Sequence, residues 1–344
     1  MTNYIYLIPL IILIFILNSF FVKKKLLLNL TGEAHQSFTS KKYIPLSGGI
    51  FLILSFIIFF DQINFLNKII IVSFYLVGFF SDIKFLKSPL IRLFLQILIT
   101  FLFIYNNELF LENTRVILID QLLEFKILNY LFVIFCITII INGTNFMDGV
   151  NCNVIGYYLL ITLILFKLNL FDDLNFNSVF IINWILILFV IYILNFFNKI
   201  YLGDNGSYFL GFFYSYLLIY IYLNNQYLSP FFIILLLWYP AFENLFSLIR
   251  KLNIKKSPFK PDQNHLHQLI FFFIKKKNLF KNRNINSLTG NIILLYNFFI
   301  FLLAFLKPEN SQYQILLILL NVILYCFFYI QLFKFKYRNL FQKK

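Results

Sequence analysis

The stretch Phe132–Phe166, FVIFCITIIINGTNFMDGVNCNVIGYYLLITLILF, places a short polar segment between two long apolar runs. Four of its polar side chains follow one another at intervals of three residues: Asn142, Asn145, Asp148 and Asn151. On a helix this spacing puts them along one stripe, where they can converge on one ligand. Polar side chains at a membrane edge are costly without partners, so the pattern favours a binding site. A turn broken by Gly143 and Gly149 is the structural alternative.

The rest of the chain shares this apolar character. Of its 344 residues, 61% are hydrophobic and only 12% are charged. Soluble domains carry about 25% charged residues, so we predict an all-α integral membrane protein. We expect one polytopic membrane domain over residues 1–344. The three cysteines, Cys136, Cys152 and Cys326, have no metal-binding spacing, which predicts neither a disulfide framework nor a thiolate zinc site.

Apolar runs that could cross a bilayer as helices, which takes about 20 residues, recur about eleven times. The predicted spans are 4–22, 44–60, 66–81, 89–105, 127–142, 153–170, 178–196, 207–223, 230–249, 290–306 and 314–333. The first span lacks the basic start and cleavage site of a signal peptide, so we predict that it stays as a membrane helix.

The basic residues predict an orientation, because Lys and Arg gather in cytoplasmic loops. With the N-terminus outside, the outer side holds five of the 29 Lys and Arg residues, and the remaining 24 lie inside. The outer five are Lys68, Arg115, Lys126, Lys167 and Lys307. The C-terminus is then cytoplasmic, as is the long loop 250–289. The net charge of +15 is mostly this topology signal, so nucleic-acid binding is not expected.

Further polar clusters fall at the ends that this orientation makes cytoplasmic. The first is HQSFTSKKYIPLSGG (His35–Gly49), in which Lys41 and Lys42 precede a pair of glycines. Lysines supply point charges for phosphate, and glycines allow close backbone approach. A turn with lysines placed only by the orientation rule is the alternative.

The second cluster is GFFSDIKFLKSPLIRLFLQ (Gly78–Gln96). Asp82 ends a span, and Pro89 suits the first turn of the next helix. Arg92 and Gln96 lie four residues apart, on one face of that helix. The alternative is a helix-end aspartate that pairs with Lys84 or Arg92.

The third of these clusters is NKIYLGDNGSYFLGFF (Asn198–Phe213), where Asp204 stands in a glycine-containing loop before Ser207, a candidate N-cap. Free N–H groups at a helix start attract anions, and a carboxylate beside them can hold Mg²⁺ bound to phosphate. A plainly capped helix start is the alternative.

The last cluster is KSPFKPDQNHLHQLI (Lys256–Ile270), with His265 and His267 two residues apart. The absence of nearby cysteines disfavours a zinc site, and the basic neighbours favour phosphate contact. Together the clusters suit a nucleoside diphosphate and Mg²⁺, since phosphoryl transfer needs charge neutralisation and positioning.

In this combination the chain resembles the polyprenyl-phosphate N-acetylhexosamine-1-phosphate transferases, the MraY/WecA-like group of glycosyltransferase family 4. The matching segments are IPLSGG, GFFSDIKFLKSPLIRLFLQ, NGTNFMDGVN, YLGDNGSYFLG and PFKPDQNHLHQL, in the family's order. The resemblance implies an eleven-span fold with its N-terminus outside, and a reaction that joins a sugar 1-phosphate from a UDP-sugar to polyprenyl phosphate and releases UMP. The active site would face the cytoplasm of a bacterial inner membrane.

The resemblance also implies roles for single residues. Asp204 would bind Mg²⁺, with Mn²⁺ as a substitute, and Asp82 would be the catalytic carboxylate. The expected substrate-binding residues are Lys41, Lys42, Asn142, Asn145, Asp148, Asn151, Tyr201, His265 and His267. Five positions depart from the family pattern, which usually has Asp at 81, His at 268, Asp-Gly at 151–152 and Asp at 243. They are Ser81, Gln268, Asn151-Cys152 and Glu243.

The histidine loop favours a UDP-HexNAc donor for cell-envelope polysaccharide synthesis. Transfer of phospho-N-acetylmuramoyl-pentapeptide in peptidoglycan synthesis is the alternative within the family. A membrane transporter is the alternative outside it, although transporters place polar groups near the midplane and often show internal repeats. The expected partners are the two substrates and the lipid bilayer, with a homodimer left open.

Overall fold

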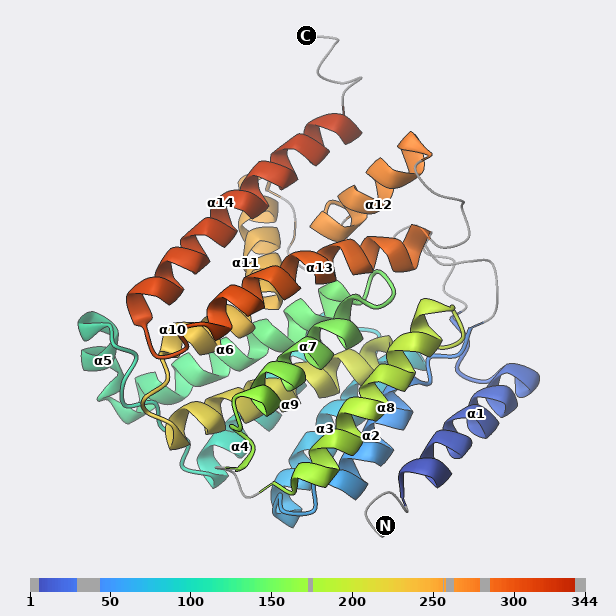
Figure 1. Ribbon diagram of the computed structural model, residues 1–344, viewed down its shortest axis with the longest axis horizontal. Coiled ribbons are helices and arrows are strands. Elements are labelled where there is room, and N and C mark those ends of the chain that lie inside the picture. The colour runs from blue at the N-terminus through green and yellow to red at the C-terminus, as the bar shows by residue number, and fades with distance from the viewer. Residues whose placement is uncertain are drawn as a thin grey trace.

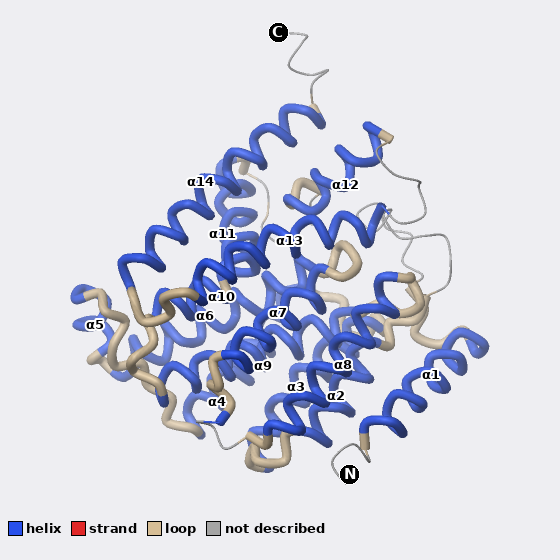
Figure 2. The backbone as a smooth tube through the Cα atoms, in the orientation of Figure 1, coloured by secondary structure: helices blue, strands red, loops and turns tan. Residues whose placement is uncertain are grey.

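The computed structural model describes residues 6–29, 44–172, 176–255, 257, 263–278 and 285–337. This part of the chain consists of helices joined by loops (Figure 2). The helices are α1 (Leu7–Lys24), α2 (Gly48–Phe59), α3 (Phe65–Asp82), α4 (Pro89–Asn106), α5 (Ile117–Leu123), α6 (Lys126–Met147), α7 (Asn153–Lys167), α8 (Ser178–Phe196), α9 (Gly203–Asn224), α10 (Pro230–Leu236), α11 (Trp238–Asn253), α12 (Leu266–Lys277), α13 (Ile285–Phe305) and α14 (Ser311–Lys336).

Each of the predicted spans overlaps one of these helices, and the ninth overlaps both α10 and α11. Within the described residues, eight helices are long and apolar enough to cross a membrane, or nine if the bent α10–α11 pair forms one span. Helices α2 and α7 are apolar but shorter. The chain is therefore a multi-pass membrane protein, and the count of eleven spans stays a prediction. The predicted loop 250–289 includes one further helix, α12.

Polar residues start several of these apolar helices. The Asn64 side chain accepts a hydrogen bond from the backbone N–H of Asn67 at the start of α3. Ser88 and Ser229 cap α4 and α10, and each is followed by a proline in the first turn, as predicted for Pro89. Proline suits this position because its missing N–H would have no helical partner there.

Helix α9 is the centre of the bundle (Figure 1). In its most apolar window 83% of the residues are buried, against 17% to 44% for the other seven candidate spans. It packs on α2, α3 and α6, and aromatic pairs such as Phe74 and Phe212, with ring centroids 4.0 Å apart, fill the contact. Gly78 lets α3 approach closely, because a Cβ added there would lie 2.3 Å from the Asp204 carbonyl oxygen.

Helices α10 and α11 are bent by 72° relative to one another. Pro240 lacks an N–H and its ring crowds the carbonyl group four residues earlier, which breaks the helix before it. That carbonyl, on Leu236, accepts a hydrogen bond from the Tyr157 hydroxyl at 2.8 Å instead. The bend turns α11 toward α6, against which it packs.

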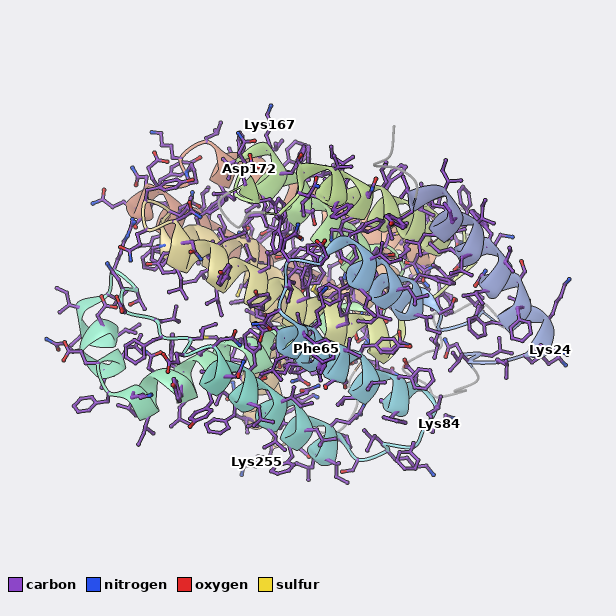
Figure 3. All side chains as sticks on the ribbon, turned by 90° about the horizontal axis from the view of Figure 1, so that it is seen from below. Lys24, Phe65, Lys84, Lys167, Asp172 and Lys255 are labelled. Atoms are coloured by element: carbon purple, nitrogen blue, oxygen red, sulfur yellow. The ribbon has the colours of Figure 1, made fainter. Side chains whose placement is uncertain are left out.

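Figure 3 labels basic side chains from both predicted sides of the membrane. Lys24 and Lys84 lie toward the right of the view, Lys167 and Asp172 lie at the top, and Lys255, which is also predicted to lie inside, is at the lower left. Which side faces the cytoplasm stays a prediction.

Candidate functional site at the start of helix α9

The first turn of α9 is capped by two carboxylates from other helices. Asp82, the last residue of α3, accepts hydrogen bonds from the backbone N–H groups of Asp204 and Asn205, each at 3.0 Å. It also accepts one from the Asn205 side chain at 2.6 Å. Asp148, which follows α6, accepts a hydrogen bond from the backbone N–H of Gly203. Negative charge at a helix start satisfies unpaired N–H groups and complements the helix dipole.

Helix α9 begins at Gly203, five residues earlier than a helix with Ser207 as its N-cap would begin. Ser207 is the fifth residue of the helix, and its hydroxyl donates to the carbonyl oxygen of Asp204 at 3.3 Å. The prediction that Ser207 caps the helix is wrong, because Asp82 and Asp148 take that task from outside the segment.

Asp204 is held from three sides. Its Oδ1 accepts a hydrogen bond from the Asn145 side chain at 2.7 Å. Its Oδ2 accepts one from the Ser81 hydroxyl at 2.6 Å and forms an ion pair with Arg92 Nη1 at 2.7 Å. Arg92 Nη1 also donates to the Tyr208 hydroxyl at 3.3 Å. The sequence left open that Asp82 pairs with Lys84 or Arg92. The structure shows instead that Arg92 pairs with Asp204, and that Asp82 accepts N–H groups of α9.

Negative charge is concentrated here. Burial raises the pKa of Asp148 well above its usual value, and the charges of Asp204 and Asp82 act in the same direction. Three carboxylates thus share one region with the single guanidinium of Arg92. Such a donor set attracts a cation.

The residues present fit a divalent ion held by a single protein carboxylate. Among the described residues, no group of three or more His, Cys, Asp or Glu side chains could form a cage for a metal. Mg²⁺ does not need one, since it takes one or two carboxylates and keeps water and phosphate oxygens as its other ligands. Asp204 suits this task, because its side chain is 27% exposed. Its Oδ1 accepts one hydrogen bond, from Asn145, which leaves a lone pair for a metal.

The polar stripe that opened the sequence does not act as one unit. Asn145 and Asp148 reach the start of α9, whereas the Asn142 side chain donates to Gln96 Oε1 at 2.8 Å on α4. Arg92 and Gln96 do share one inward face of α4, as their spacing indicated. Asn142 therefore braces the helix that carries Arg92.

Asn151 lies elsewhere, in a network that joins α7, α8 and α13. Its side chain donates to the carbonyl oxygen of Asn195 at 2.7 Å and to Asn198 Oδ1 at 2.9 Å. It accepts a hydrogen bond from Asn286 at 3.2 Å. Its polar atoms are thus engaged away from Asp204, which favours a structural role. The predicted substrate contact for Asn151 stays a prediction.

Tyr201 is also buried, with 6% of its surface exposed. Its backbone N–H donates to the Pro45 carbonyl oxygen, and its own carbonyl accepts from the Gly48 N–H, each at 2.9 Å. These bonds fasten the glycine pair at the start of α2 to the loop before α9. A ring so covered offers little surface for stacking on a base, and the predicted uracil contact stays a prediction. Lys41 and Lys42 lie outside the described residues.

The two histidines lie near this site, at the start of α12. Their rings are nearly parallel, with centroids 5.6 Å apart. His267 is 1% exposed, and neither of its ring nitrogens has a hydrogen-bond partner among the described residues. A Cβ added at Gly149 would lie 2.3 Å from His267 Nε2, so the ring sits against the turn that carries Asp148. Burial lowers the pKa of His267 to about 3.

Several residues that shape the site received no role from the sequence. The sequence predicts for Arg92 only a place on a helix face or a pair with Asp82, and it predicts no role for Asn205 or Tyr325. The signal for Arg92 was its isolation, since a single arginine inside a long apolar helix needs a partner. No local signal marks Asn205 or Tyr325, because their partners lie on other helices.

Comparison with known proteins supports the resemblance. Residues 65–222 match the model of a family described as "Glycosyl transferase family 4". That range contains Ser81, Arg92, Asp148 and Asp204. A stretch of 71 residues, 21% of this chain, is 34% identical to a protein of Thermotoga maritima named "Undecaprenyl-phosphate alpha-N-acetylglucosaminyl 1-phosphate transferase". The match spans 23% of that relative's length.

Proposed function

We propose that this chain, which belongs to glycosyl transferase family 4 through residues 65–222, transfers a sugar 1-phosphate from a UDP-sugar to polyprenyl phosphate. An oxygen of the lipid phosphate forms a bond to the β-phosphorus of the donor. The bond from that phosphorus to the bridging oxygen breaks, and UMP leaves with the bond's electron pair. The products are polyprenyl-diphospho-sugar and UMP. This reaction would be the first step in the synthesis of a cell-envelope polysaccharide.

The observation that carries the proposal is the group of side chains around Asp204. Phosphoryl transfer between two anions needs cations and donors that neutralise charge and set the geometry. Asp204 would hold Mg²⁺, which supplies positive charge to the phosphate oxygens when bound. The buried Nε of Arg92 has no partner among the described residues and can donate to a phosphate. The histidine pair against Gly149 can contact the donor's diphosphate.

The other polar residues around Asp204 have further proposed roles. Asp148 and Asn145 are proposed to hold the nucleotide next to the start of α9. Asp82 stays the proposed catalytic carboxylate, with a further task that the sequence did not predict. Both of its oxygens accept N–H groups of α9, so it also fixes the backbone that carries Asp204.

The donor is proposed to be a UDP-HexNAc. The name of the Thermotoga maritima relative specifies an N-acetylglucosaminyl 1-phosphate, which favours this donor over UDP-N-acetylmuramoyl-pentapeptide. The proposed setting is a bacterial cytoplasmic membrane, with the site at the cytoplasmic side, where nucleotide sugars are available.

The test is a donor panel. Purified protein in detergent is mixed with undecaprenyl phosphate, Mg²⁺ and one labelled UDP-sugar at a time, and UMP and lipid-linked product are measured. Mn²⁺ replaces Mg²⁺ in a parallel series. We expect the unmodified protein to form product from a UDP-HexNAc. Asp204→Asn should lose this activity, and the exposed control Asp61→Asn should retain it.

Two outcomes contradict the proposal. Lipid-linked product from the pentapeptide donor alone refutes the HexNAc assignment. If folded protein releases no UMP from any donor, the proposed transferase activity is refuted and a membrane transporter becomes the favoured function.

A further inference from the structure

A pocket of about 440 Å³ lies between α12 and the end of α14, apart from the candidate site at the start of α9. Lys275 and Lys276 of α12 and Lys336 of α14 line it, together with the rings of Phe271 and Phe272. Its volume falls in the range of about 300–1,000 Å³ that is common for ligand sites. Lysines beside aromatic rings favour a ligand that carries a negative group next to an apolar part.

The charge around the pocket is of one sign among the described residues. The sequences of α12 and α14 contain no Asp or Glu, and no carboxylate from the described part of the chain lines the pocket. Lys275 and Lys276 are exposed in the last turn of α12. A surface of this kind attracts anions, and a lysine ammonium group can donate three hydrogen bonds to a phosphate.

Aromatic rings support the two exposed lysines. Lys276 Nζ lies 5.8 Å from the centre of the Phe272 ring and 5.0 Å from that of Phe335 on α14. Lys275 Nζ lies 5.9 Å from the centre of the Phe271 ring. A cation within about 6 Å of an aromatic ring is attracted to it. The rings therefore favour lysine conformations that keep both ammonium groups beside the pocket.

The pocket lies where α14 reaches the membrane surface. Only 22% of the most apolar window of α14 is buried, so much of this candidate span is available to lipid. Its last turn carries Lys334 and Lys336, and lysines near the end of a membrane helix extend toward the headgroups. Helix α12 packs against α14 (Figure 1). A ligand in this pocket would therefore lie at the level of the lipid headgroups.

The wall of the pocket is joined to the segment that carries the two histidines. Lys336 Nζ donates to the carbonyl oxygen of Gln263 at 2.6 Å and to Asn264 Oδ1 at 2.8 Å. Gln268 also lines the pocket, and its Oε1 accepts the backbone N–H of His265 at 3.1 Å. A bound ligand would thus contact residues that hold the start of α12.

We propose that this pocket binds the phosphate headgroup of an anionic phospholipid, with Lys275 and Lys276 as the phosphate ligands. Basic pockets between membrane helices suit such headgroups, because each lysine near the membrane surface adds attraction to an anionic lipid. A phospholipid is favoured over a free phosphate, since its acyl chains can stay in the bilayer beside α14. This site is separate from the proposed transferase site and does not depend on turnover.

The test is native mass spectrometry of the purified full-length protein in detergent. The protein is titrated with phosphatidylglycerol, or with phosphatidylcholine that has the same acyl chains. We expect one phosphatidylglycerol to bind more tightly than phosphatidylcholine. The double variant Lys275→Gln with Lys276→Gln should lower the affinity for phosphatidylglycerol about tenfold or more and leave the affinity for phosphatidylcholine unchanged.

The matched control is the double variant Lys23→Gln with Lys24→Gln. These two lysines also stand in the last turn of an apolar helix, α1, which lies away from α12 and α14 (Figure 1). We expect this control to bind phosphatidylglycerol as the unmodified protein does. An equal loss of affinity in the two double variants would assign the binding to surface charge in general and overturn the proposal.

Other outcomes also decide against the site. Equal affinity of the unmodified protein for the two phospholipids overturns the proposal, even if the variants do not fold. Displacement of phosphatidylglycerol by an equal concentration of inorganic phosphate would assign the pocket to a soluble anion. Displacement by an equal concentration of undecaprenyl phosphate would assign it to the polyprenyl substrate. Either result overturns the phospholipid assignment, and each can be read from protein that releases no UMP.

Discussion

Replacing Asp82 by asparagine separates its structural task from any catalytic one. The carboxylate accepts three N–H groups, two from the backbone of Asp204 and Asn205 and one from the Asn205 side chain. Asparagine keeps one acceptor oxygen and places an NH₂ group where the other stood. Depending on its orientation, it loses one or two of the three hydrogen bonds and sets donor against donor.

The cost follows from these bonds. A hydrogen bond to a charged group contributes about 1.5–3 kcal/mol, and negative charge at a helix start adds about 0.3–1 kcal/mol. We therefore expect Asp82→Asn to lower the free energy of unfolding by about 2–4 kcal/mol. Turnover should fall as well, because Asp204 sits on the backbone that Asp82 holds.

The assay is unfolding in detergent micelles, by denaturant titration followed by tryptophan fluorescence and circular dichroism. Asp61→Asn is the matched control, since this exposed aspartate lies in the loop before α3. A stability of Asp82→Asn within about 0.5 kcal/mol of the unmodified protein, the usual range for surface substitutions, would refute the capping role. Loss of turnover at unchanged stability would leave Asp82 a purely catalytic carboxylate.

The remaining predictions concern the neighbours of Asp82. Arg92→Gln removes the cation 2.7 Å from Asp204, so Mn²⁺ should bind the donor-free protein more tightly by electron paramagnetic resonance, and unchanged affinity would contradict the ion pair. Ser81→Ala should keep measurable UMP release, because Asn145 and Arg92 still hold Asp204. Gly149→Ala should lower the initial rate about tenfold or more, since its Cβ would meet the His267 ring at 2.3 Å. Burial lowers the pKa of His267 to about 3, so below about pH 6.5 the unfolded chain binds a proton that the folded chain does not. The free energy of unfolding should then decrease as the pH is lowered below about 6.5, by up to about 1.4 kcal/mol per pH unit. His267→Gln should make the free energy of unfolding less dependent on pH in this range.

The helices could be predicted from the sequence because the signal for each one is local. Apolar runs long enough to cross a bilayer became helices at or near the predicted positions. Pro89 began α4 as expected. The boundaries moved where polar residues continued a helix, as at Asn145, which lies within α6 beyond the predicted end of the span at residue 142. A hydropathy pattern ends at the first polar residue, whereas backbone hydrogen bonding does not.

The membership of the candidate site could be predicted only in part. The motifs indicated Asp204, Asp148 and Asn145, and the structure brings these three together. The same regular spacing also indicated Asn151, which the fold turns toward Asn195 and Asn286. Spacing along the chain gives the face of one helix, and the helix ended before Asn151 was reached.

The amino-acid sequence alone predicts a chain that crosses a membrane several times and carries the motifs of a phosphosugar transferase. Composition, hydropathy and short motifs depend on residues that are neighbours in the chain. The packing of the helices is needed to show that Asp82 caps α9, that Arg92 pairs with Asp204, and that Glu243 contacts His265. Each of these contacts joins residues on different helices, and the choice of partner depends on how α9 packs within the bundle.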